Sequence, residues 1–112
     1  MELSVQELAG RLNRGDAVVL LDVRETFERE LCAIEVPSNA ADLHIPMRSI
    51  SARLPELRLA AGERALIVYC HHGVRSRAVV EWLLGQGIEG VENLSGGIDA
   101  WSREVDPSVP RY

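Results

Sequence analysis

Cys70 is the residue whose surroundings most clearly predict chemistry. It follows the apolar run Leu66–Tyr69, which is typical of a buried strand, and precedes a segment with the apolar spacing of a helix. The order strand, loop, helix directs loop amides and a helix N-terminus at the sulfur, and these groups stabilise an anion. Since the thiolate is the reactive form of cysteine, the pattern predicts a nucleophile at Cys70. The alternative is a buried cysteine that only ends a strand.

The loop after Cys70 supplies the other candidate site residues, which are His71, His72, Gly73, Val74, Arg75 and Ser76. We expect Gly73 to allow a backbone turn with positive φ and Arg75 to attract an anionic substrate. Cysteine and histidine also bind metals, but consecutive residues in a tight loop rarely converge on one ion. No carboxylate or second cysteine lies within ligand spacing. The prediction is therefore that the site uses no metal and no cofactor.

The composition removes several other function classes. The length of 112 residues predicts one domain, residues 1–112. All twelve basic residues are arginines, which excludes a Schiff-base lysine and a Walker-type phosphate loop. Cys32 and Cys70 form no C-x-x-C motif, and a disulfide between them is not expected in a reducing compartment.

The net charge and the hydropathy of the chain restrict its possible partners and its location in the cell. The net charge of -5 argues against nucleic acid and against an anionic membrane surface as partners. No apolar run approaches the roughly 18 residues that a transmembrane helix needs. Residues 1–4 lack a basic region followed by an apolar stretch. We therefore expect a cytoplasmic protein. The initial methionine and the capped helix after it favour a stand-alone protein, and the alternative is a piece of a larger chain.

The elements before the loop can be predicted from capping and apolar patterns. A capping box at Ser4 begins a helix that runs to about Asn13. Val18–Leu21 is a buried strand, since its residues are all apolar. Asp22 and Arg24 then lie at the carboxyl edge of the sheet, where α/β folds place their ligands. The alternatives are a helix-capping role for Asp22 and a surface ion pair for Arg24.

Residues 26–48 and the helix after them are less strongly patterned. Residues 26–32 should form a short helix, and residues 35–42 have the composition of a surface loop. We expect His44 to be structural, packed beside a short strand. Ser49 or Ser51 is the predicted cap of a helix that carries Ile50, Leu54 and Leu57.

After the Cys70 loop, a helix should end at residues 85–87, and residues 91–94 should form a last strand. Residues 95–97 are a tight turn, whose glycine pair either approaches the Cys70 loop or only turns the chain. A helix over residues 98–103 carries Trp101 into the core, and the proline-rich residues 106–112 should lie along the surface. Strands alternating with helices predict an α/β fold with a parallel sheet covered on both faces.

Three stretches of the chain resemble single-domain rhodanese-like sulfurtransferases. They are residues 20–25 (LLDVRE), residues 70–76 (CHHGVRS) and residues 93–101 (NLSGGIDAW). Residues 33–47 depart from the family pattern through a longer loop. The resemblance implies a three-layer sandwich with a small central parallel sheet of about five strands. It also implies that Asp22 and Arg24 support the loop without taking part in the chemistry.

The function implied by this resemblance is the transfer of sulfane sulfur. Cys70 would take sulfur from thiosulfate or a persulfide, hold it as a persulfide, and pass it to a thiol or cyanide. The acceptor could be a protein thiol or a sulfur carrier. Four residues separate Cys70 from Arg75, whereas cysteine phosphatases have five, which makes phosphatase or arsenate reductase activity a minor alternative. A non-catalytic interaction module, or a sulfur-relay partner of an adenylating enzyme, is the other alternative.

Overall fold

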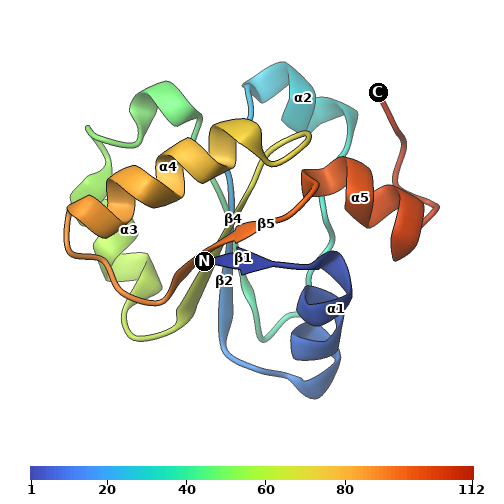
Figure 1. Ribbon diagram of the computed structural model, residues 1–112, viewed down its shortest axis with the longest axis horizontal. Coiled ribbons are helices and arrows are strands. Elements are labelled where there is room, and N and C mark those ends of the chain that lie inside the picture. The colour runs from blue at the N-terminus through green and yellow to red at the C-terminus, as the bar shows by residue number, and fades with distance from the viewer.

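The computed structural model describes residues 1–112 as a five-stranded sheet with helices on both faces (Figure 1). All neighbouring strands are parallel, in the order β1-β5-β4-β2-β3. The strands are β1 (Glu2–Leu3), β2 (Val18–Asp22), β3 (Ala41–His44), β4 (Ala65–Tyr69) and β5 (Val91–Leu94). The helices are α1 (Val5–Arg14), α2 (Thr26–Leu31), α3 (Leu54–Ala61), α4 (Val74–Gly85) and α5 (Gly97–Glu104), with a 3-10 turn at Met47–Ser49.

Alternating side chains of the central strands divide the core into two layers. Leu66, Val68 and Cys70 belong to the cluster shared with α3 and α4, whereas Ile67 and Tyr69 belong to the cluster shared with α1 and α5. Figure 1 shows the two helix pairs on opposite sides of the sheet, with α2 above its upper end. Because both faces are covered, β2 and β4 are apolar almost throughout. The predicted α/β class, with helices on both faces, is confirmed.

Several local predictions are also confirmed. Ser4 and Glu7 form the predicted capping box of α1, and Gly15 ends that helix with a φ of 77°. β5 has the predicted bounds, and α5 is one residue longer at each end than predicted. Trp101 is buried in the core. These elements have strong local signals, because capping residues and continuous apolar runs depend little on distant contacts.

Three predictions about the less patterned segments are wrong. Residues 41–42 begin β3 rather than ending a loop, and His44 is the last residue of that strand, paired with Asp22. Neither Ser49 nor Ser51 caps α3, which begins at Leu54 after Arg53 without a side-chain cap. β3 is a half-exposed edge strand, so it lacks the apolar run by which a buried strand is recognised.

Both chain ends differ from expectation. Glu2–Leu3 forms a short edge strand beside β5 that the sequence pattern did not predict. The tail does not simply lie along the surface, because Val109 is buried and Tyr112 packs against the Cys70 loop. The C-terminus lies close to α2 at the upper end of the sheet (Figure 1). No helix has the length and apolar character needed to cross a membrane.

Candidate active site

Cys70 lies at the carboxyl end of β4, inside a loop that directs amides at its sulfur. The backbone N–H groups of Gly73 and Ser76 donate to Cys70 Sγ over 3.1 and 3.4 Å. Gly73 has a φ of 95°, which the loop requires to turn into α4. Cys70 is 1% exposed, and both cysteines are free thiols. Two amides and the start of α4 therefore face the sulfur, an arrangement that stabilises a bound anion.

A buried hydroxyl completes the surroundings of the sulfur. Ser76 Oγ lies 3.3 Å from Cys70 Sγ and donates to Asn93 Oδ1 over 2.5 Å. The amide nitrogen of Asn93 donates to Gly73 O and to Glu2, which fixes the orientation of the amide group. Ser76 thus uses its one hydroxyl hydrogen in the bond to Asn93, and its oxygen can accept a hydrogen bond from the Cys70 thiol. The two backbone amides remain as the donors to a thiolate.

Because Ser76 donates to Asn93 and not to the sulfur, its hydroxyl should matter for stability more than for the reaction at Cys70. We expect Ser76→Ala to lower the free energy of unfolding by about 1–2 kcal/mol, because Asn93 Oδ1 loses its donor inside the protein. If Cys70 carries sulfur, as the family resemblance implies, its loading should persist, since both backbone amides remain. Urea denaturation and peptide mass spectrometry measure the two effects. A folded Ser76→Ala protein that takes up no sulfur would show instead that the hydroxyl is required.

The first turn of α5 holds the Cys70 loop from the other side. The N–H groups of Ile98 and Asp99 donate to the carbonyl oxygens of Cys70 and His71, each over 3.0 Å. Gly97 has a φ of 60°, and a Cβ built on it would lie 2.5 Å from both of these oxygens. Of the two interpretations of the glycine pair, the structure supports close approach to the loop. A side chain at position 97 would separate α5 from the loop.

We therefore expect Gly97→Ala to lower the free energy of unfolding by about 2–4 kcal/mol, because of strain and a backbone clash. The sulfur uptake at Cys70 that the family resemblance implies should fall with the displaced loop. Chemical denaturation and peptide mass spectrometry test both effects. Gly85→Ala is the matched control, since a Cβ added there would have no atom within 4 Å and the φ of Gly85 is ordinary. Equal stability of the two variants would contradict the prediction.

Arg75 does not point freely toward incoming substrate. Its two terminal nitrogens donate to the two oxygens of Glu28, over 2.7 and 2.9 Å. Hydrogen bonds from Arg75 hold the pKa of Glu28 at about 2, against the opposing effect of burial. Attraction of an anionic donor by a free Arg75, as expected from the sequence, is therefore opposed by a carboxylate in direct contact.

Tyr112 connects this ion pair with the loop and with the sheet. Its hydroxyl donates to Glu28 Oε2 over 2.8 Å and accepts from Arg24 Nη1 over 2.9 Å. Its ring stacks on His71, with centroids 3.8 Å apart and planes 7° apart. Burial raises the pKa of Tyr112 to about 12, so the phenol remains protonated at neutral pH. Tyr112 thus packs against His71, the residue that follows Cys70.

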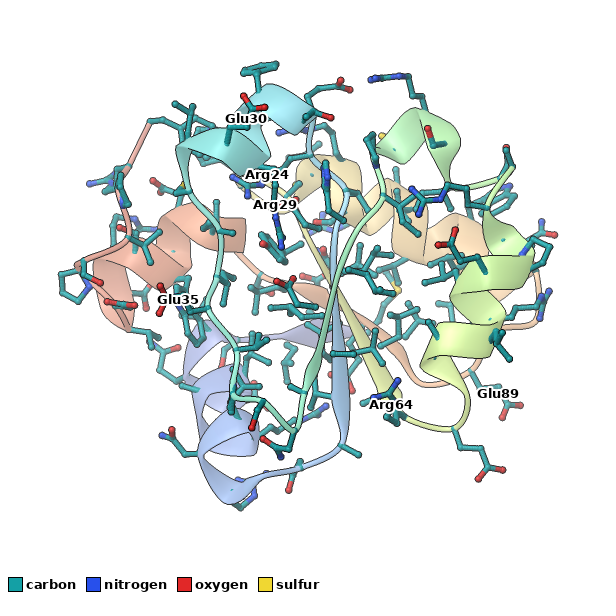
Figure 2. The ribbon with its side chains drawn as sticks, turned by 180° about the vertical axis from the view of Figure 1, so that it is seen from behind. Arg24, Arg29, Glu30, Glu35, Arg64 and Glu89 are labelled. Atoms are coloured by element: carbon teal, nitrogen blue, oxygen red, sulfur yellow. The ribbon has the colours of Figure 1, made fainter.

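Asp22 and Arg24 form a fully buried ion pair at the carboxyl end of β2. Arg24 donates to both oxygens of Asp22, at 2.9 and 2.8 Å, and to the carbonyl of Cys32 at 2.7 Å. Figure 2 shows Arg24 and Arg29 close together beneath α2. Neither Asp22 nor Arg24 contacts the sulfur. Arg24 reaches the loop through Tyr112 and through Glu28, whose carbonyl oxygen accepts from Arg24 Nη1 over 3.4 Å and whose side chain binds Arg75.

The two loop histidines stack on each other, with ring centroids 3.8 Å apart. Ligand atoms of His71, His72 and Asp99 lie within 4.8 Å of one another, so the fold supplies a carboxylate that sequence spacing did not reveal. Both oxygens of Asp99, however, accept hydrogen bonds from arginines of α5 and the tail. Burial lowers the pKa of His71, with a further contribution from His72. The His71 ring therefore packs between His72 and Tyr112.

The sequence motifs reveal the loop and its supports but not the groups that surround them. Glu28, Asn93 and Tyr112 come from α2, β5 and the tail. No local motif distinguishes Glu28 from the other acidic residues near it. Tyr112 follows a proline-rich segment, which carries no signal for where it packs. Arg77 is exposed and pairs with Glu2 over 3.3 Å.

Known proteins resemble this chain over almost its whole length. The family model of the Rhodanese-like domain matches residues 4–104. A protein named Sulfurtransferase from Allochromatium vinosum is 33% identical over 108 residues, which cover 96% of this chain and 94% of that protein. The crystal structure of a Rhodanese-like domain protein from Staphylococcus aureus is 30% identical with a TM-score of 0.76, covering 99% of this chain and 97% of that one.

Other relatives are much longer proteins. Rhodanese-like/PpiC domain-containing protein 12, chloroplastic, of Arabidopsis thaliana is 35% identical over 99% of this chain, which spans 37% of that protein. Adenylyltransferase and sulfurtransferase MOCS3-1 of Zea mays is 34% identical over 88% of this chain, which spans 21% of that protein. The same unit therefore occurs within larger chains.

Proposed function

The chain belongs to the rhodanese-like family, and from that premise we propose that it is a sulfurtransferase that carries sulfane sulfur as a persulfide on Cys70. Its homology with proteins named as sulfurtransferases supports this general type of activity. The observation that carries the specific proposal is the buried thiol of Cys70, which accepts hydrogen bonds from the N–H groups of Gly73 and Ser76. The same amides would stabilise the charge of a persulfide anion.

The proposed reaction has two steps. The Cys70 thiolate attacks the outer sulfur of the donor, a sulfur–sulfur bond forms, and the old bond breaks with its electron pair on the leaving group. For thiosulfate the leaving group is sulfite, and for a persulfide it is a thiolate. An acceptor thiolate or cyanide then attacks the outer sulfur and releases the Cys70 thiolate. Each step transfers a neutral sulfur atom, so no external oxidant or reductant is needed.

The size of the loop favours sulfur over phosphate as the transferred group. Four residues separate Cys70 from Arg75, so fewer loop amides surround the thiol than in a cysteine phosphatase. Phosphatase activity is therefore not proposed.

The acceptor in this proposal is a thiol, either small or carried by a protein. The maize relative combines adenylyltransferase and sulfurtransferase in its name, which supports a sulfur-relay role beside an adenylating enzyme as the second candidate. A reducing compartment such as the cytoplasm would keep Cys32 and Cys70 as free thiols. Asp22 and Arg24 are proposed as supports of the site.

Mass spectrometry of the intact protein tests this function directly. The reduced protein is exposed briefly to thiosulfate or to a cysteine persulfide, desalted, and digested without reductant. We expect one added sulfur atom on the peptide that contains Cys70, and its loss after cyanide or a thiol is added. The absence of added sulfur with every donor would reject the persulfide mechanism and favour an interaction module.

A further inference from the structure

Every cation near the mouth of the Cys70 loop is already paired with a carboxylate. Arg75 is held by both oxygens of Glu28, and Arg77 donates to Glu2 over 3.3 Å. The chain contains no lysine, and its net charge is -5. A dianion approaching the sulfur therefore meets no uncompensated positive side chain on the loop or on the first turn of α4.

Hydrogen bonds keep the Glu28 carboxylate ionised and fix its position. Its side chain is only 6% exposed, and Oε1 accepts from Arg75 and from the N–H of Glu25, while Oε2 accepts from Arg75 and Tyr112. Four hydrogen bonds satisfy both oxygens of this carboxylate. Tyr112 is itself fixed by Arg24 and by stacking on His71. The negative charge beside Arg75 is therefore a permanent feature of the folded protein.

Arg75 would be the natural partner of an anionic donor if Glu28 were absent. Hydrogen bonds with Glu28 raise the pKa of Arg75, and Arg75 lies in the first turn of α4, whose start faces the sulfur. Its side chain is 37% exposed, so a donor could contact it. Glu28 and the donor thus compete for the same guanidinium.

We propose that Glu28, held by Tyr112, sets the donor class of this site, selecting sulfane sulfur on organic persulfides and other donors of low charge over the thiosulfate dianion. This inference rests on the proposed function, because it concerns the donor that loads Cys70. It assigns to Glu28 a specificity role, not a catalytic one. The bonds formed and broken at Cys70 are the same for every donor.

Two sulfonyl-type donors that differ in charge test this role, because the difference between their leaving groups is the same for every variant. Thiosulfate carries two negative charges and releases sulfite, whereas methanethiosulfonate carries one and releases methanesulfinate. In each case the Cys70 thiolate takes a neutral sulfur atom and becomes a persulfide anion. The ratio of kcat/KM for thiosulfate to that for methanethiosulfonate, measured with one thiol acceptor, therefore reports the electrostatics of the site. A persulfide of an uncharged thiol serves as the third donor.

Glu28→Gln is the decisive variant, because it removes the charge and keeps the size of the side chain. We expect it to raise this ratio by about tenfold, since the freed Arg75 attracts the second charge of thiosulfate. The gain should diminish at high salt, because salt screens exposed charges. Tyr112→Phe should raise the ratio less, and Glu28→Asp should retain the ratio of the unmodified protein. Glu56→Gln, which breaks the exposed pair with Arg53, is the matched control and should change nothing.

The outcomes separate the two proposals. A ratio that does not rise in folded Glu28→Gln overturns the specificity role, even if Cys70 still takes sulfur from every donor. Preference of the unmodified protein for thiosulfate over both other donors also overturns it. If no donor places sulfur on Cys70, the proposed function itself fails. If Glu28→Gln does not fold, Tyr112→Phe decides, because its ratio must then rise above that of Glu56→Gln.

Discussion

Cys70→Ser is expected to abolish sulfur transfer, with a loss of about a thousandfold or more, while the protein remains folded. Serine keeps the shape of the side chain, and its hydroxyl can still accept from the N–H groups of Gly73 and Ser76 that now contact the sulfur. It cannot form a persulfide. Steady-state sulfur transfer and peptide mass spectrometry should both show the loss, and circular dichroism should show the unchanged fold.

Cys32→Ser is the control for that experiment. Cys32 is half-buried after α2, and its sulfur lies 3.8 Å from Arg24 Nη1, outside the loop. We expect this variant to take up one sulfur atom on the peptide that contains Cys70, at the rate of the unmodified protein. Transfer that survives in Cys70→Ser and disappears in Cys32→Ser would assign the nucleophile to the other cysteine and overturn the mechanism.

The sequence predicted the central part of the fold because its signals there are local. Val18–Asp22 and Ala65–Tyr69 are apolar because helices cover both faces of the sheet, and the order of strand and loop places Cys70 at the carboxyl edge. The edge strands β1 and β3 were missed or misjudged. An edge strand pairs on one side only, so its residues need not follow the pattern of a buried strand.

The candidate site was predicted in part, and what was missed depends on tertiary contacts. The sequence identified the loop and the expected supports Asp22 and Arg24, through motifs that match a family. It did not reveal that Glu28 compensates Arg75, or that Tyr112 lies between Glu28 and Arg24. Arg75 and Tyr112, whose side chains donate to Glu28, lie 47 and 84 residues away from it along the chain. Only the folded chain brings these charges together.

The proposed role of Arg24 as a support predicts a direct effect on stability. We expect Arg24→Met to lower the free energy of unfolding by about 3–5 kcal/mol at pH 7, because Asp22 would lose its main partner inside the protein. Both side chains are 0% exposed, so water cannot replace the lost hydrogen bonds without a rearrangement. A domain of this size is stable by only about 5–15 kcal/mol, so the variant would be marginally folded.

Urea denaturation of a small set of variants tests whether the unpaired charge of Asp22 causes this loss of stability. Asp22→Asn combined with Arg24→Met should be less destabilised than the sum of the two single changes, because the double variant leaves no unpaired charge. Arg53→Met is the matched control, since it breaks the exposed pair with Glu56 and should cost less than about 1 kcal/mol. If Arg24→Met were as stable as Arg53→Met, the buried pair would contribute nothing to the fold. The contacts of Tyr112 and Glu28 with the Cys70 loop would then not depend on the Asp22–Arg24 ion pair.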